Sequence, residues 1–107
     1  GRDLVSGIPK TIDIRTDEIR QALKDPVKRI LDVIKDALEA TPAELSSDII
    51  DRGIVLAGGG SQLRGLDQVL REKTGVPVNV ADEPHLAIVK GCGAVIEDLE
   101  KYKHVLL

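Results

Sequence analysis

The sequence predicts an α/β fold in which parallel strands are covered by helices. Ile54 to Ala57 form an unbroken apolar run, as in a parallel strand with helices on both faces. Three glycines, Gly58 to Gly60, follow at once, and apolar residues then recur at helical spacing over 63–70. A strand, a glycine turn and a helix in this order are typical either of a turn that binds a ligand at the carboxyl end of a parallel strand or of a tight connection with no ligand.

The composition suits one small globular domain or a piece of one. The chain has 107 residues, of which 42% are hydrophobic and 31% charged, and Tyr102 is its one aromatic residue, so the core must be aliphatic. A net charge of -3 with scattered basic residues gives no footprint for nucleic acid, and we expect no such partner. The chain opens on Gly1-Arg2-Asp3 without a methionine, and we expect an excised fragment.

The first 15 residues predict a β-hairpin. Gly7 supplies the positive φ of a tight turn, and Pro9, which lacks an N–H donor, suits an edge or a bulge. Ile12 and Ile14 alternate with polar residues and are expected to face the core.

A long amphipathic helix is predicted from an N-cap at Thr16 to Leu38, with an apolar period near 3.6. Pro26, with Asp25 as a possible cap, predicts two helices or one kinked helix. The polar face is expected to point outward, where it is either available to a partner or simply solvated. It includes Lys24, Lys28, Arg29, Asp32 and Lys35.

Three further elements follow from local signals. Thr41 to Glu44 read as a capping box that starts a short helix with Leu45, Ile49 and Ile50 inward and Gly53 at its end. Gly75 ends the helix after the glycine turn, and residues 76–80 alternate as in a strand.

The last helix is capped by Asp82 and is apolar nearly all round as far as Ile96, which predicts a buried helix. Cys92 within it is expected to be a small buried hydrophobic residue. Gly91 and Gly93 indicate close approach of either a neighbouring backbone or a ligand, and the sequence does not decide between them.

The chain offers no catalytic group or metal site by pattern. Its glycines fit neither the dinucleotide fingerprint nor the phosphate loop, and Ser61 has no evident base. His85, Cys92 and His104 are too dispersed to bind a metal together. His85 is as compatible with an exposed first-turn residue as with a ligand contact.

Residues 51–60 and 63–66 closely resemble the MreB-like bacterial actin homologues. The similarity extends over 1–12, 41–45, 74–78 and 90–93, and so over essentially the whole chain. It implies that residues 1–107 are a single actin-like, ribonuclease-H-like subdomain, most of subdomain IIA, with a hairpin and parallel strands covered by helices.

The resemblance also implies a site. The residues that would line ATP are Gly58, Gly59, Gly60 and Ser61. Gln62 and Leu63 would lie near the adenine or ribose. The family usually has Leu-Thr where this chain has His85-Leu86, and an apolar residue is common where Gln62 stands. The phosphate loops and the groups that position water and Mg²⁺ belong to family segments absent here, so no catalytic or metal residue is assigned.

By the same resemblance, the full-length protein is a filament-forming ATPase of the cell-shape cytoskeleton. It would use ATP or ADP with Mg²⁺ and assemble with itself at the inner face of the cell membrane. A RodZ-like membrane-anchored partner is implied, with membrane contact only through segments absent here. The alternatives are a wall of an actin-fold small-molecule kinase and an interaction module with no nucleotide role. We expect the 107 residues alone to show no ATPase activity.

Overall fold

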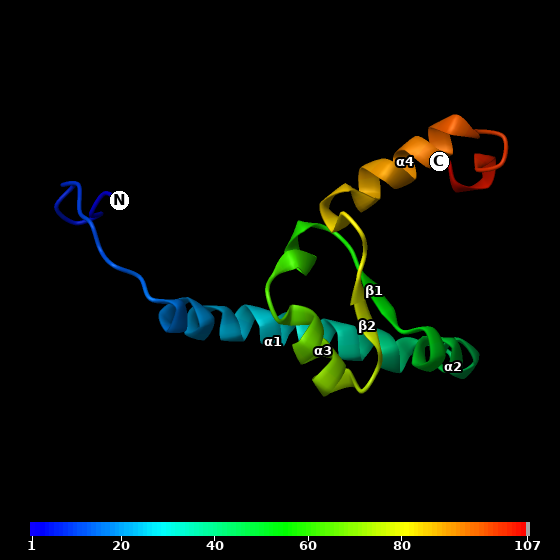
Figure 1. The fold of residues 1–107 in the computed structure, drawn as a ribbon, viewed down its shortest axis with the longest axis horizontal. Coiled ribbons are helices and arrows are strands. Elements are labelled where there is room, and N and C mark those ends of the chain that lie inside the picture. The colour runs from blue at the N-terminus through cyan, green and yellow to red at the C-terminus, as the bar shows by residue number, and fades with distance from the viewer. Residues whose placement is uncertain (107) are drawn as a thin grey trace.

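The computed structural model describes residues 1–106, and its core forms where two helices meet a pair of strands (Figure 1). The elements in order are α1 (Thr16–Ala40), α2 (Ala43–Arg52), β1 (Ile54–Leu56), η1 (Gly59–Gln62), α3 (Leu66–Thr74), β2 (Val78–Val80), η2 (Pro84–Leu86), α4 (Ala87–Glu97) and η3 (Lys103–Val105). Those labelled η are short 3₁₀ helices.

The strands β1 and β2 pair in parallel, with α3 as the crossover between them. Ile54 lies opposite Val78, and Leu56 lies opposite Val80. The Ile54 N–H donates to the Pro77 carbonyl at 2.7 Å at one end of the pair, and the Ala81 N–H donates to the Leu56 carbonyl at 2.9 Å at the other. The α/β class predicted from the apolar run and its glycine turn is therefore confirmed.

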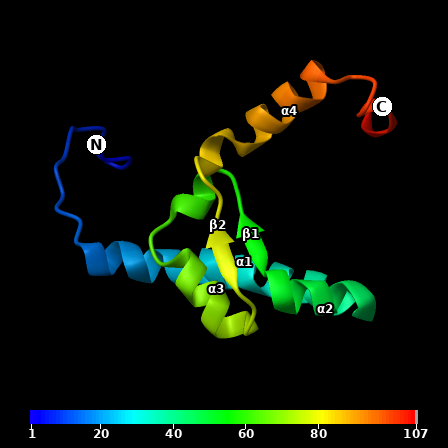
Figure 2. The same cartoon turned by 45° about the vertical axis from the view of Figure 1, so that its right-hand side comes forward.

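The core is small and aliphatic. Its buried members come from α1, α3 and β2, and they are Leu31, Leu66, Leu70 and Val78. Side chains from one stripe of α1 and from β1 pack around them: Val27, Ile34, Ile54 and Leu56. Figure 2 shows α1 running behind the two strands and alongside α3, so the strands have a helical layer on that side.

Arg71 fastens α3 to β2 from the outside of this core. Its Nε donates to the Val78 carbonyl at 2.8 Å, and its Nη2 lies 2.5 Å from Asp67 one turn earlier. Gly75 ends α3 in the left-handed conformation, with φ 69°, as its position in the sequence predicted.

The helix α1 runs through Pro26 as a single element, so of the two predicted alternatives the division into two helices at Asp25 is wrong. Proline removes one N–H from the helical ladder, but this stretch is exposed, and water can satisfy the carbonyl that loses its partner. The helix also starts differently. Arg15 rather than Thr16 holds the N-cap position, and its N–H donates to the Glu18 carboxylate at 3.2 Å.

The capping box predicted at Thr41 does not form, because the Thr41 hydroxyl donates to the Ala37 carbonyl at 2.7 Å. It thereby serves the end of α1, and Pro42 holds the N-cap position of α2. Of the three apolar residues expected inward from α2, Ile49 is half-buried, whereas Leu45 and Ile50 are exposed.

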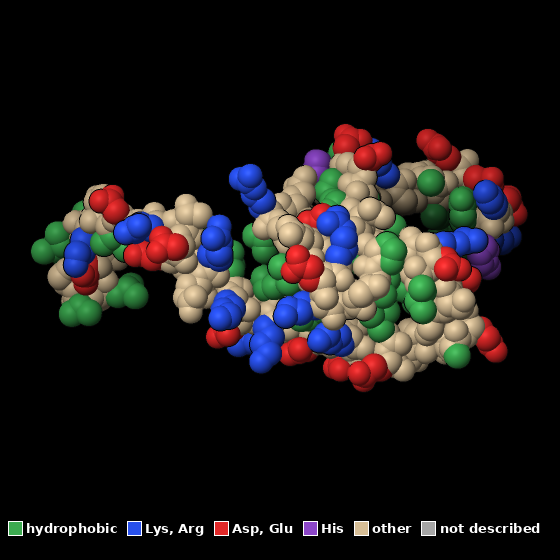
Figure 3. Space-filling view, turned by 60° about the horizontal axis from the view of Figure 1, so that its bottom comes forward, with side chains coloured by type: hydrophobic (Ala, Val, Ile, Leu, Met, Phe, Trp, Pro, Cys, Tyr) green, Lys and Arg blue, Asp and Glu red, His purple; other side chains and the backbone are tan. Residues whose placement is uncertain are grey.

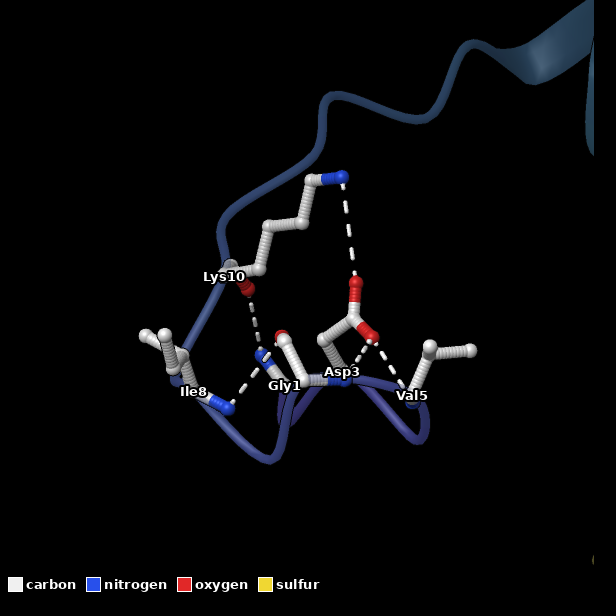
Figure 4. A network of polar contacts seen from close by, with 6 residues as sticks. Gly1, Asp3, Val5, Ile8 and Lys10 are labelled. Carbon is white, nitrogen blue, oxygen red and sulfur yellow. Dashed lines mark hydrogen bonds and ion pairs between the residues drawn. The ribbon is translucent and has the colours of Figure 1, made fainter.

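The predicted N-terminal hairpin forms only at its tip: an antiparallel bridge joins Arg2 and Pro9, and the Asp3 N–H donates to the Ile8 carbonyl at 3.0 Å. Gly7 has the expected positive φ, at 70°, but no strand pairing continues into residues 11–14. The Asp3 carboxylate accepts the N–H groups of Val5 at 2.8 Å and Ser6 at 3.0 Å (Figure 4). These bonds, from Ser6 first and then Val5, lower the pKa of the Asp3 carboxyl.

Ile12 and Ile14 lie in the linker after this turn and do not reach the core. Both are mainly exposed, at 69% and 62%. Alternating apolar residues form a strand only where a second strand offers its N–H and C=O groups, and no element among residues 1–106 lies beside this segment to do so.

The helix α4 leaves the core and has no buried residue among those described, so the predicted burial of this helix is wrong for this chain. Ile88 and Ile96 are 78% and 70% exposed, and Cys92 is exposed as well. A Cβ added at Gly91 or Gly93 would meet no atom of another described segment within 4 Å, so no other backbone among residues 1–106 packs closely there.

The molecule is consequently extended. Its radius of gyration is 19.4 Å, against about 13 Å for a compact domain of this size. Its accessible surface of 9025 Å² compares with about 5,800 Å² for a compact protein of the same mass. Among the helices described, none is both long and apolar enough to cross a lipid bilayer.

Candidate functional site

The glycine turn lies at the carboxyl end of β1, as predicted, but it leads into a short 3₁₀ helix and not directly into α3. Gly58 has φ 85° and opens the turn, η1 follows, and Gly65 with φ 85° then starts α3. Two glycines and a serine have low α-helical propensity, and Gly65 breaks the run in the left-handed region. The α-helix whose N-terminus was expected at the strand end therefore begins several residues later.

The turn is open at its three glycines. A Cβ added at Gly58, Gly59 or Gly60 would meet no atom within 4 Å, and of these three only Gly58 has positive φ. Nothing in the described part of the chain therefore requires Gly59 and Gly60 to lack a side chain. Open space beside a bare backbone permits another molecule to approach the peptide groups closely.

The remaining predicted site residues follow in the same turn and differ in exposure. Ser61 is buried, and its hydroxyl donates to the Gly58 carbonyl at 2.6 Å, which closes the turn. Gln62 and Leu63 are exposed, and Leu63 caps η1 instead of joining the helical pattern that the sequence indicated over 63–70. The chain thus presents the backbone of the glycines and the side chains of residues 62 and 63 to its surroundings.

A second loop, which follows β2, contacts the glycine turn through a backbone hydrogen bond. The Gly58 N–H donates to the carbonyl of Pro84 at 2.7 Å, and Pro84 is buried. Because β1 and β2 are parallel, their carboxyl ends meet at one edge of the sheet, and this hydrogen bond joins the two loops there. Local sequence signals do not predict this contact, since it depends on the pairing of two strands.

Glu83 in this loop has an unusual backbone. Its φ of 46° and ψ of 58° lie in the left-handed region, and Glu83 is the one non-glycine residue with positive φ among those described. Such a conformation costs of order 1–3 kcal/mol and persists where surrounding contacts hold it. The Glu83 carboxylate pairs with the Lys90 ammonium on the first turn of α4, and the Leu86 N–H donates to the Glu83 carbonyl at 2.9 Å.

Other polar residues near this edge form no reactive group. Asp82, predicted as the cap of the last helix, is not its N-cap, because α4 begins at Ala87 with Leu86 in that position. His85 is exposed. Among residues 1–106, no three His, Cys, Asp or Glu side chains cluster closely enough to hold a metal ion.

The parallel strand pair with its crossover helix is part of an α/β architecture that this chain shares with solved structures of the actin-like class. MreB5 of Spiroplasma citri bound to ADP matches with a TM-score of 0.85 and 33% identity, over 97% of this chain and 32% of that one. The same protein bound to AMPPNP matches with a TM-score of 0.85 and 33% identity, over 100% and 32%. The chain therefore has an actin-like fold.

The family model described as MreB/Mbl protein matches residues 1–104, and the chain belongs to that family. The cell shape-determining protein Mbl of Bacillus subtilis is 46% identical over 101 residues, which are 94% of this chain and 30% of Mbl. The cell shape-determining protein MreB of Escherichia coli is 42% identical over 102 residues, or 95% and 29%. The chain thus spans less than a third of the length of these curated relatives.

Proposed function

We propose that residues 58–63 form the adenosine-side wall of an ATP site in a filament-forming bacterial actin homologue that directs cell shape. One observation carries this proposal: the open glycine turn stands at the carboxyl edge of a sheet whose fold matches nucleotide-bound MreB5. Ligands of open α/β sheets favour that edge. We call the full-length protein that would contain these 107 residues the intact protein.

The residues present fit the nucleoside part of such a ligand. Bare backbone at Gly59 and Gly60 leaves room for a ribose or an adenine ring to lie against the peptide groups. The exposed amide of Gln62 both donates and accepts hydrogen bonds, which suits the polar edge of either group. The glycine turn therefore binds and orients the nucleoside.

Phosphate chemistry requires groups that the described residues do not bring together. Phosphoryl transfer needs a positioned Mg²⁺ and a group that orients water, and those would come from other parts of the intact protein. Residues 1–107, as most of subdomain IIA, would supply one wall of the site, and the chain alone would not hydrolyse ATP.

Filament assembly, a RodZ-like partner and a location at the inner face of the cell membrane belong to the same proposal. The polar face of α1 is exposed and free to meet a neighbour, and its residues are Lys24, Lys28, Arg29, Asp32 and Lys35. Figure 3 shows basic and acidic side chains intermixed on this side of the molecule. That mixture suits simple solvation equally well, so the nucleotide site and not this face carries the proposal.

The test is Gly59→Val in the intact protein. A Cβ there meets no atom within 4 Å in the described part of the chain, and the branched side chain would occupy the space proposed for the nucleoside. We expect ATP affinity to fall about tenfold or more, since tenfold corresponds to only about 1.4 kcal/mol, with an unchanged melting temperature.

The matched control is Gly75→Ala, at the opposite edge of the sheet. Gly75 has φ 69° in open space, so this variant should lose stability by about 1 kcal/mol and keep its affinity for ATP. Titration with a fluorescent ATP analogue and thermal melts measure both quantities. Normal ATP binding by Gly59→Val would refute the assignment of the turn.

A further inference from the structure

The contact between the two loops at the carboxyl edge is connected to α4 through one ion pair. Pro84 holds the Gly58 N–H at 2.7 Å, Glu83 precedes Pro84, and the Glu83 carboxylate contacts the Lys90 ammonium. Lys90 lies on the first turn of α4. The ion pair, the peptide bond between Glu83 and Pro84, and the hydrogen bond to Gly58 therefore connect that helix to the first glycine of the turn.

The backbone at Glu83 needs such support. A left-handed conformation is rare for a glutamate, and a following proline further restricts the residue before it. Relaxation of Glu83 toward an extended conformation would swing the Pro84 carbonyl away from Gly58. The local bond from the Leu86 N–H to Glu83 closes the loop, but it does not determine where the loop sits relative to β1.

We propose that Glu83 and Lys90 are positioning residues for the nucleotide site. Their ion pair holds the loop after β2 in its left-handed conformation, and Pro84 in turn fixes Gly58 and the opening of the glycine turn. The pair also makes the geometry of the turn depend on where the first turn of α4 lies. The role in nucleotide binding rests on the function proposed above, whereas the effect on Gly58 does not.

The size of the effect follows from the exposure of the pair. The two side chains are 55% and 59% exposed, so solvent screens their attraction, and its loss should change a local equilibrium only a few-fold. Such a change is measurable at the atoms involved. It should also disappear near 1 M salt, where the Debye length shrinks to about 3 Å.

The first experiment is hydrogen exchange on the intact protein without nucleotide. Lys90→Gln removes the charge and leaves the Glu83 backbone unaltered. We expect the Gly58 amide to exchange about threefold faster at low salt. The Ile54 amide, which donates to the Pro77 carbonyl at the opposite end of β1, should be unchanged and serves as the internal reference.

Two further variants separate this role from a general loss of charge. The exchanged pair Glu83→Lys with Lys90→Glu should restore the slow exchange of Gly58. Lys103→Gln makes the same change of charge at another exposed ion pair, in which the Lys103 ammonium of η3 lies 3.9 Å from the Glu100 carboxylate. This variant should have no effect on Gly58. Unchanged Gly58 exchange in Lys90→Gln, or failure of the exchanged pair to restore it, would overturn the proposal.

The second experiment measures the dissociation constant for ADP. We expect it to rise about threefold in Lys90→Gln at low salt, to recover in the exchanged pair, and to show no difference at about 1 M salt. A general structural defect would not disappear with salt.

If Gly59→Val binds ADP normally, the nucleotide site itself is refuted while the exchange of Gly58 still decides the role of the ion pair. If Gly59→Val fails to bind and Lys90→Gln binds normally at every salt concentration, the positioning role in binding is refuted alone.

Discussion

The strand–helix–strand unit and the helix that follows it differ in what happens to their apolar residues. Leu70 in α3 and Val78 in β2 are each 1% exposed, whereas Ile88 and Ile96 in α4 lie open. Both regions have the sequence pattern of buried elements. The difference teaches that periodicity identifies which face of an element is apolar, while burial requires a second surface, and for α4 no such surface lies within the described residues.

The relatives are about three times as long as this chain, so the intact protein has further residues that can pack against α4. We expect the intact protein to cover the apolar side of α4 with residues outside these 107. The glycine turn stands at the boundary between the two regions, since η1 contacts η2 and η2 contacts α4.

The largest effect should come from the core, and it tests the comparison directly. In the 107-residue chain, Leu70→Ala should destabilise folding by about 2–5 kcal/mol, because it leaves a cavity among packed aliphatic side chains. Ile96→Ala in the same chain should change stability by less than about 0.5 kcal/mol. Urea unfolding followed by circular dichroism measures both, and equal costs would show that α4 is packed after all.

Gly53→Ala should come next, at about 2–3 kcal/mol. Gly53 has φ 82°, and a Cβ there would lie 2.5 Å from the Pro77 carbonyl oxygen, the atom that accepts the Ile54 N–H. An alanine must therefore push the two strands apart where their pairing starts. The same unfolding measurement applies, and a variant as stable as the original would contradict this geometry.

A smaller effect should distinguish the intact protein from the fragment at α4. Ile96→Ala in the intact protein should cost about 1–3 kcal/mol if that helix is covered there. The difference between the cost of Ile96→Ala in the intact protein and its cost in the 107-residue chain measures how strongly the covering surface stabilises α4. A cost under about 0.5 kcal/mol in both would show that α4 remains solvent-exposed in the intact protein as well.

The smallest effect belongs to the N-terminal turn and depends on pH. The folded pKa of Asp3 is lowered, so its stabilisation is complete above the unfolded pKa of about 3.9 and is lost as pH falls through the folded value. Amide exchange at Val5 and Ser6 should therefore lose protection only in acid, and Asp3→Asn should abolish that pH dependence. A carboxyl titration by NMR with its midpoint above 3.9 would contradict the sign.

Local signals predicted the central unit well. The parallel strands, the glycine turn and the end of α3 at Gly75 follow from residues adjacent in sequence, and the structure has them. The candidate site was located as a turn, but its ligand contacts remain a prediction. Its support by Pro84 and Glu83 was missed, because residues 58 and 84 become neighbours only when β1 and β2 pair.

The errors have related causes. The continuation of the hairpin through Ile12 and Ile14 and the burial of Cys92 each assumed a partner surface that the described residues do not provide. The division at Pro26 overestimated one lost hydrogen bond in a helix that is stabilised by the packing of Val27 and Leu31. In each case tertiary context decided the outcome.

The short connection between β1 and β2 affects how the chain folds during its synthesis. The paired strands and their crossover helix lie within Ile54–Val80, so the contacts that join them span little sequence and can form early during synthesis. In the described chain each strand pairs on one side only, and open strand edges recruit other chains. Until neighbouring segments cover these strand edges, the unit is therefore exposed to aggregation.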